Sequence, residues 1–158
     1  MSESELESIR HYRRLGPMLA SAGQPDPDQL ALLPPTFDCV INLARPDSPH
    51  ALDNEADLVN RLGLDYVHIP VDFRNPLPQD LAEFFAAMQA HASERLFVHC
   101  ALNWRASAFV FLHRVINEQR DPARARADML AVWQPDPTWQ AFIDSMLLRH
   151  GGNNNPAE

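Results

Sequence analysis

The segment "FVHCALNWRASAF", residues 97–109, carries the clearest structural signal in the chain. The apolar run at 96–99 is typical of a short buried β-strand. Cys100 follows at once, four residues separate it from Arg105, and apolar side chains over 109–116 then recur at helical spacing. The segment therefore predicts a strand, a tight loop and a helix, with a thiol and a guanidinium at the two ends of the loop.

Similar patterns precede this segment. Two further apolar runs rich in β-formers, 39–43 and 66–69, predict strands, and helical patterns lie at 53–62 and 81–88. The stretch 9–24 can supply one or two additional edge strands. Because strands that alternate with helices need crossover connections, we expect a mostly parallel sheet with helices on both faces.

The last third of the chain is predicted to be helical. Three Asp-Pro pairs each place an N-cap before a proline at the first helical position. They predict helices near 27–33, 122–133 and 137–149. The expected fold class is α/β, with a central, mostly parallel sheet flanked by helices and a helical C-terminal third. We expect one domain over residues 1–150 and a disordered tail over 151–158.

The composition of the chain excludes two classes of binding partner, nucleic acids and anionic membranes. With 158 residues and a net charge of −8, the chain lacks the basic face that nucleic acids or anionic membranes require. No apolar run approaches the ~18 residues of a membrane span. The two cysteines give neither a disulfide framework nor metal-ligand spacing, which fits a reducing cytoplasm without metal or cofactor. The oligomeric state stays open between a monomer and a weak homo-oligomer.

The loop between Cys100 and Arg105 is a candidate anion site. Ligands of such sheets lie beyond the carboxyl ends of the strands, where the next helix begins. The unpaired N–H groups and the dipole of that helix favour an anion, and they favour thiolate over thiol at Cys100. Arg105 can hold two oxygens of one phosphate. The loop suits a tetrahedral oxyanion or a persulfide, whereas the structural alternative is a packing cysteine beside a surface arginine.

Phosphoryl transfer from a thiolate also needs a proton donor for the departing oxygen. Asp72 follows a predicted strand and opens the proline-bounded loop of "HIPVDFRNP", residues 68–76. From there it can reach over the loop of Cys100. The alternative is that Asp72 only caps its own loop. Asp65 and Asp80 are poorer candidates, because one begins a strand and the other begins a helix.

Four segments together resemble a known family. "VHCALNWRAS" (98–107) follows "YVHIPVDF" (66–73), with "SAGQP" (21–25) and "VINLARPD" (40–47) before them. This arrangement is similar to the small bacterial proteins of the tyrosine and dual-specificity phosphatase superfamily, over roughly residues 9–145. The resemblance implies the cysteine-phosphatase fold and metal-independent hydrolysis of a phosphate monoester, such as phosphotyrosine, through a cysteinyl-phosphate. The implied partner is a phosphorylated protein or small molecule.

The resemblance also assigns roles to residues. Cys100 matches the nucleophile, Arg105 the phosphate-binding arginine and Asp72 the general acid, while His99 matches the histidine that helps to set the surroundings of the thiolate. The expected substrate-binding set consists of Ala101, Leu102, Asn103, Trp104, Ser107 and His99. Gly23 and Gln24 can line the site from the N-terminal loop.

The loop departs from the family pattern in two respects. The superfamily has five residues between cysteine and arginine and a glycine among them, whereas this loop has four and Asn103, which tolerates a left-handed backbone. Either the loop is one residue shorter, or Arg105 has moved forward and Ala106 takes the usual position of the arginine. We prefer the second alignment because it keeps Ser107 in register with the hydroxyl that assists departure of the thiolate.

Two alternative functions fit the same residues. The four-residue spacing also resembles the active loop of rhodanese-type sulfurtransferases, whose smaller cradle suits a persulfide. The third hypothesis is a catalytically weak, phosphatase-like module that binds phosphorylated or anionic partners. The "HC" pair and the upstream "PVDF" favour the phosphatase hypothesis.

Overall fold

Strand β5 (Leu96–His99) lies at the centre of a five-stranded sheet with the order β1-β2-β5-β3-β4. This computed structural model describes residues 3–151. The other strands are β1 (Arg13–Gly16), β2 (Leu19–Ala22), β3 (Cys39–Asn42) and β4 (Asp65–His68). All neighbours pair in parallel except β1 and β2, which are antiparallel. The prediction of a mostly parallel α/β sheet is confirmed.

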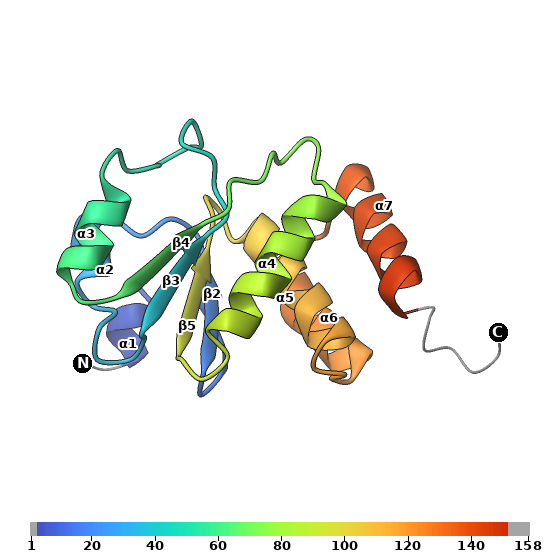
Figure 1. The fold of residues 1–158 in the computed structure, drawn as a ribbon, viewed down its shortest axis with the longest axis horizontal. Coiled ribbons are helices and arrows are strands. Elements are labelled where there is room, and N and C mark those ends of the chain that lie inside the picture. The colour runs from blue at the N-terminus through green and yellow to red at the C-terminus, as the bar shows by residue number, and fades with distance from the viewer. Residues whose placement is uncertain (1–2, 152–158) are drawn as a thin grey trace.

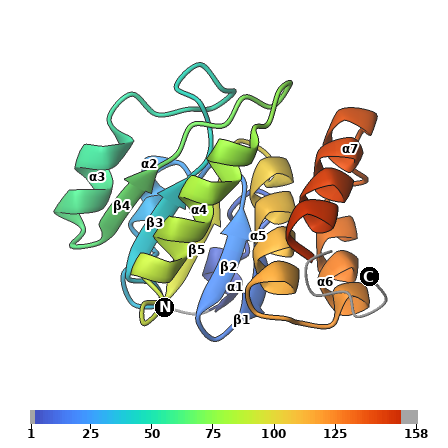
Figure 2. The same ribbon diagram turned by 45° about the vertical axis from the view of Figure 1, so that its right-hand side comes forward.

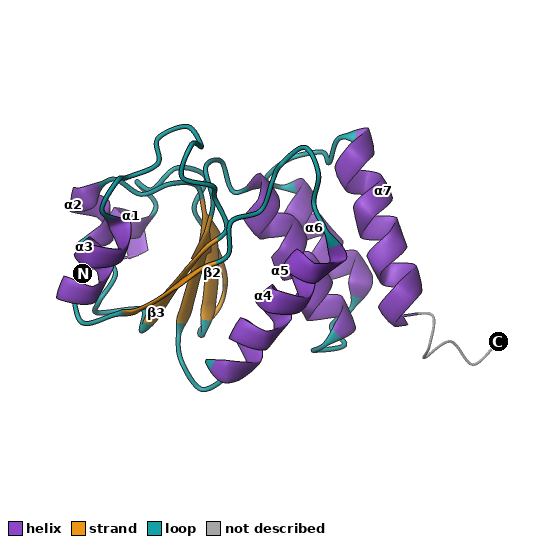
Figure 3. Cartoon of the chain, turned by 45° about the horizontal axis from the view of Figure 1, so that its top comes forward, coloured by secondary structure: helices purple, strands orange, loops and turns teal. Residues whose placement is uncertain are grey.

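Helices cover both faces of this sheet (Figures 1 and 3). On one side lie α1 (Glu3–Leu6), α2 (Pro27–Leu30) and α3 (Glu55–Arg61). On the other lie α4 (Pro78–Ala90), α5 (Trp104–Ile116), α6 (Pro122–Leu130) and α7 (Pro137–Met146), which continues as a π-helix over Leu147–Gly151. Figure 2 shows α6 and α7 outside α5, which itself packs on the sheet.

The two faces of the central strands bury different core clusters. Along β5, Val98 faces the cluster formed with α4 to α7, and Phe97 faces the cluster formed with α1 to α3. Along β3, Ile41 faces the first of these clusters and Val40 faces the second. Every residue of β3 and β5 is buried, which is why both read as continuous apolar runs rather than as alternating ones.

The Asp-Pro caps are confirmed, although two of the helices that they begin are shorter than expected. The carboxylates of Asp26, Asp121 and Asp136 each accept a backbone N–H of the first turn. Helix α2 ends at Leu30 and α6 at Leu130. Prolines stand a few residues beyond both ends, and a proline disfavours the helical conformation of the residue before it.

The prediction for residues 9–24 is wrong in one respect. The stretch forms two strands, but only β1 is an edge strand. Strand β2 is an interior strand, because it pairs with β5 on its other side, with Ala22 opposite His99. This register carries the end of β2 to the carboxyl end of β5, next to Cys100.

The tail expected over 151–158 lies outside the described residues, apart from Gly151. Within residues 3–151, no helix has both the length and the apolar character needed to cross a membrane.

Candidate active site

The loop after β5 turns on an asparagine. Cys100 follows the strand directly, and α5 begins at Trp104. Asn103 adopts the left-handed conformation with φ of 69°, and its carbonyl oxygen accepts the helical hydrogen bond from the Ser107 N–H at 2.9 Å. Its side-chain amide donates to the carbonyl of His11 at 2.9 Å. Asparagine tolerates this conformation better than most residues, so the loop makes its turn without glycine.

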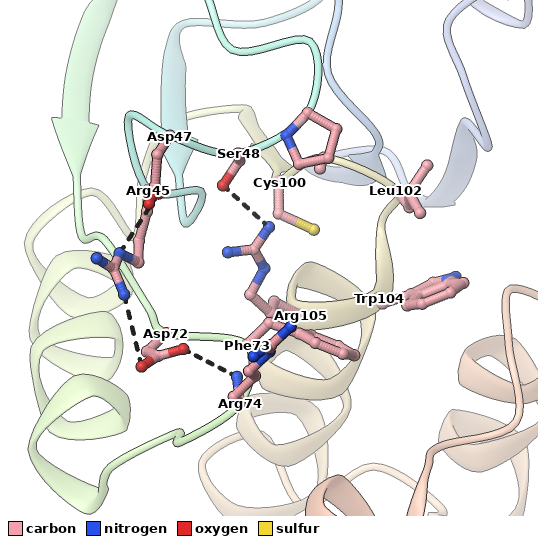
Figure 4. Close-up of a pocket in the computed structure, with 12 residues that line it drawn as sticks. Arg45, Asp47, Ser48, Asp72, Phe73, Arg74, Cys100, Leu102, Trp104 and Arg105 are labelled. Atoms are coloured by element: carbon pink, nitrogen blue, oxygen red, sulfur yellow. Dashed lines mark hydrogen bonds and ion pairs between the residues drawn. The ribbon is translucent and has the colours of Figure 1, made fainter.

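A cavity of about 520 Å³ opens beyond the carboxyl ends of the parallel strands. It brings together the three predicted catalytic residues, Cys100, Arg105 and Asp72 (Figure 4). The cavity is lined by Arg45, Asp47, Ser48, Pro49, Asp72, Phe73, Arg74, Cys100, Ala101, Leu102, Trp104 and Arg105. Of the expected substrate-binding residues, Ala101, Leu102 and Trp104 line it, whereas His99, Asn103 and Ser107 do not.

The thiol lies at the N-terminus of α5. The backbone N–H of Ala106 donates to the Cys100 Sγ at 3.5 Å, which is a contact that stabilises negative charge on sulfur. The guanidinium of Arg105 reaches into the same space, as Figure 4 shows. It donates to the Val71 carbonyl at 2.8 Å and to the Ser48 hydroxyl at 3.5 Å. The side chain, which is buried, is therefore held from two other segments.

Asp72 stands across the cavity from the loop, between two arginines (Figure 4). Its Oδ1 accepts the backbone N–H of Arg74 at 2.9 Å, and its Oδ2 lies 3.5 Å from the Arg45 guanidinium. The side chain is about half-exposed. Asp72 thus both caps its own loop and faces the cavity, so the two interpretations of this residue do not exclude each other.

Aromatic rings form one wall of the cavity. The ring of Trp104 stacks on Trp133, with centroids 5.1 Å apart and planes within 2°. Phe73 packs on Trp104 at 5.7 Å, and the Phe73 carbonyl accepts a 2.7 Å hydrogen bond from the indole of the buried Trp139. Trp139 therefore fixes the loop of Asp72 against the helical side of the molecule. Trp104 lines the cavity, whereas Trp133 and Trp139 pack on Phe73 without lining it.

The remaining predicted residues lie behind the loop or inside α5. His99 is fully buried, with Nδ1 3.1 Å from the Cys100 carbonyl and Nε2 2.6 Å from the Glu55 carboxylate. The Ser107 hydroxyl donates to the carbonyl of Trp104 at 3.0 Å. Gly23 and Gln24 contact the back of the loop instead of lining the cavity: the Gln24 N–H donates to the Ala101 carbonyl at 2.9 Å.

Sequence reasoning missed several cavity residues, above all Arg45, Ser48 and Arg74. These residues follow β3 and β4, whose carboxyl ends meet at the same edge of the sheet as that of β5. The rule that pointed to Cys100 could therefore have found them. Glu55 offered no such signal, because it is one of several acidic residues at the start of a polar helix.

One group of potential metal ligands occurs among the described residues, and it lies away from the cavity. Single ligand atoms of Cys39, His91 and Glu94 lie within 4.8 Å of one another. Cys39 begins β3, at the other end of the strand from the cavity. Burial, together with Glu94, Asp65 and Asp38, raises the pKa of the Cys39 thiol to about 12, so this thiol stays protonated at neutral pH.

Comparisons with known proteins agree with this geometry. No protein-family model and no curated protein matches the sequence. A solved structure from Shewanella putrefaciens named "Putative phosphatase (DUF442)" is 36% identical, with a TM-score of 0.84 over 94% of this chain and 99% of that one. TpbA of P. aeruginosa, solved in complex with pTyr, is 16% identical, with a TM-score of 0.68 over 91% of each chain. PTPMT1, solved in complex with PI(5)P, is 13% identical, with a TM-score of 0.74 over 91% of this chain and 99% of that one.

This chain has a strand–loop–helix unit that places a cysteine and an arginine at one cavity, as the resemblance implied. The chain belongs to the DUF442 proteins within the cysteine-dependent tyrosine and dual-specificity phosphatase superfamily.

Proposed function

We propose that this protein is a metal-independent phosphatase that hydrolyses a phosphate monoester through a cysteinyl-phosphate. The observation that carries the proposal is the meeting of Cys100, Arg105 and Asp72 at one cavity, with the Cys100 sulfur at the N-terminus of α5. The helix N-terminus and the guanidinium supply positive potential where the substrate carries negative charge. The family membership supports the same reaction class.

In the first step, the Cys100 thiolate attacks phosphorus and the bond from phosphorus to the ester oxygen breaks. Asp72 gives its proton to the departing oxygen. For this the carboxyl must turn from Arg45, 3.5 Å away, toward the ester. In the second step, the Asp72 carboxylate takes a proton from water, which attacks phosphorus and releases inorganic phosphate and the thiolate. Arg105 and the N–H groups of the loop bind the phosphoryl oxygens throughout.

We infer further that the ester is an aryl phosphate, with phosphotyrosine as the model substrate. The wall formed by Phe73 and Trp104 offers apolar ring surface in the cavity of the thiol, and Trp133 packs on both rings, with centroids 5.1 to 5.8 Å apart. An aryl group can pack against such a wall with offset or edge-to-face geometry. TpbA, which has the same fold, was solved with pTyr.

The test is hydrolysis of p-nitrophenyl phosphate by the purified protein in the presence of a chelator. We expect turnover that Cys100→Ser abolishes and Cys39→Ser retains, because Cys39 lies at the other end of the sheet. Phosphotyrosine peptides should be better substrates than matched phosphoserine peptides. Transfer of sulfur from thiosulfate to cyanide would instead support a rhodanese. Tight binding of phosphate esters without turnover would contradict the proposal and support a binding module.

A further inference from the structure

Glu55, the first residue of α3, is an unusual carboxylate because it is buried to 4% exposure. Side chains of this type are almost never fully buried without partners. One oxygen lies 2.6 Å from the Nε2 of His99, and the other accepts a 2.7 Å hydrogen bond from the side-chain amide of Gln24. Both partners also contact the backbone of the loop that carries Cys100, so Glu55 is linked to that loop through His99 and Gln24.

The partners of His99 define its protonation state. Its Nδ1 lies 3.1 Å from the Cys100 carbonyl, which can only accept a hydrogen bond, so Nδ1 carries a hydrogen. Its Nε2 faces the Glu55 carboxylate. Burial raises the pKa of Glu55, but the charge and hydrogen bond of His99 and the hydrogen bond of Gln24 outweigh it, and the net pKa is lowered. The carboxylate also accepts from Gln24, and a charged carboxylate that faces Nε2 at 2.6 Å requires Nε2 to carry a hydrogen as well.

Gln24 ties the same carboxylate to the next residue of the loop. Its side chain donates to Glu55, while its backbone N–H donates to the Ala101 carbonyl at 2.9 Å. The carbonyls of Cys100 and Ala101 are therefore both held by groups that Glu55 orients. A cation at His99 would stabilise an anion at the neighbouring Cys100, since charges attract strongly where water is excluded.

We propose that Glu55 is a positioning residue of the active site, which holds His99 as an imidazolium behind Cys100 and so stabilises the thiolate. The proposal rests on the proposed function for its catalytic consequence, but not for the charge on His99. Two other titratable groups face Glu55, both from β4. The Nε2 of His68 donates to the Ala44 carbonyl, 2.7 Å away, and Tyr66 stays neutral because burial raises its pKa to about 12.

Two measurements on the full chain test the proposal without turnover. The first is nitrogen-15 NMR of the histidine rings of the wild-type protein. We expect both ring nitrogens of His99 to carry a hydrogen at neutral pH, as the two acceptors that face them require. The second is the rate of alkylation at Cys100 against pH, read by mass spectrometry so that Cys39 does not interfere. Glu55→Gln should move this profile to higher pH, by about one unit for a tenfold loss of thiolate.

The matched control is Glu94→Gln, which removes a carboxylate 3.1 Å from the ring nitrogen of another histidine, His91, far from the cavity. It should leave the Cys100 profile unchanged. A neutral His99 ring in the wild-type protein at neutral pH would overturn the proposal, whether or not Glu55→Gln folds. So would an unchanged Cys100 profile in a folded Glu55→Gln. A protein without phosphatase activity that still shows the shift would refute the proposed function alone.

Discussion

The guanidinium of Arg105 donates a 2.8 Å hydrogen bond to the carbonyl of Val71, the residue before Asp72. This bond joins the loop after β5 to the loop after β4, so the residue proposed to bind phosphate also orients the segment of the proposed acid. The planar guanidinium has enough donors to keep this bond and still offer two to a phosphate.

Replacing Arg105 with lysine keeps the charge but removes the planar group. We expect Arg105→Lys to bind inorganic phosphate or vanadate roughly 10- to 100-fold more weakly, since hydrogen bonds of charged groups contribute about 1.5–3 kcal/mol. Turnover should fall further, because the loop of Asp72 loses its link through Val71. Inhibition constants and kcat measured on p-nitrophenyl phosphate check this. Arg105→Ala should lose both, and near-normal inhibition of either variant would show that the guanidinium does not bind the anion.

The role of Asp72 is tested by the chemistry of the leaving group. Asp72→Asn should slow hydrolysis of an alkyl phosphate by roughly 100-fold or more, because its leaving oxygen needs a proton. An activated aryl phosphate should lose less, because its leaving group departs as an anion. Asp47→Asn, which removes another carboxylate from the cavity, is the control. Equal losses on both substrates would assign Asp72 to the structure of its loop.

Gly23 is predicted to tolerate no side chain. A Cβ there would lie 2.6 Å from the Ala101 carbonyl and 3.1 Å from that of Arg10, both backbone atoms. Gly23→Ala must therefore displace the loop of Cys100, at a cost of about 1–3 kcal/mol typical of overpacking, and should reduce kcat. Gly16→Ala is the matched control, since nothing lies within 4 Å of its Cβ. Thermal unfolding and kcat of both variants check the prediction, and equal behaviour would contradict it.

Asp38 should contribute to stability in mild acid. Hydrogen bonds from the side chain and backbone of Arg95 hold its pKa at about 2, below the ordinary 3.8. Because the folded pKa is the lower one, the contribution is complete above 3.8 and is lost as the pH falls toward 2. The melting temperature of Asp38→Asn should therefore lie below that of the wild type at neutral pH, and the difference should vanish near pH 2.

The expected difference is small, because the pair is more than one-third exposed and solvent screens it. Asp57→Asn provides the control: it removes a carboxylate of a more exposed pair with Arg61, one helical turn apart. It should change the melting temperature less. A difference for Asp38→Asn that is independent of pH would show that the hydrogen bonds, and not the charge, stabilise the fold.

The strand–loop–helix unit at Cys100 was predictable because its signals are local. An apolar run, a short polar loop and a helical pattern follow one another within 97–109. The caps of Asp26, Asp121 and Asp136 were predictable for the same reason. The ends of the helices were less predictable, because the final turn of a helix depends on packing as well as on the sequence around it.

The interior position of β2 and the burial of Glu55 were not predictable, because both depend on partners distant in the chain. Strand β2 pairs with β5, which lies far away in the sequence, and no local pattern in residues 19–22 indicates that partner. Glu55 resembles its exposed acidic neighbours in the sequence, and only the fold brings His99 and Gln24 to it. Long-range polar contacts leave no periodic pattern in a sequence.

The order β1-β2-β5-β3-β4 has a consequence for how the molecule is made. Strand β5 is the last to leave the ribosome, yet it lies between β2 and β3, which are both synthesised earlier. Until it inserts, those two strands present unpaired edges, and contacts between segments so far apart in the chain close slowly. Cys100 follows β5 directly, so the cavity is completed only after the sheet itself has closed. A nascent chain released before this point would carry open strand edges and no functional site.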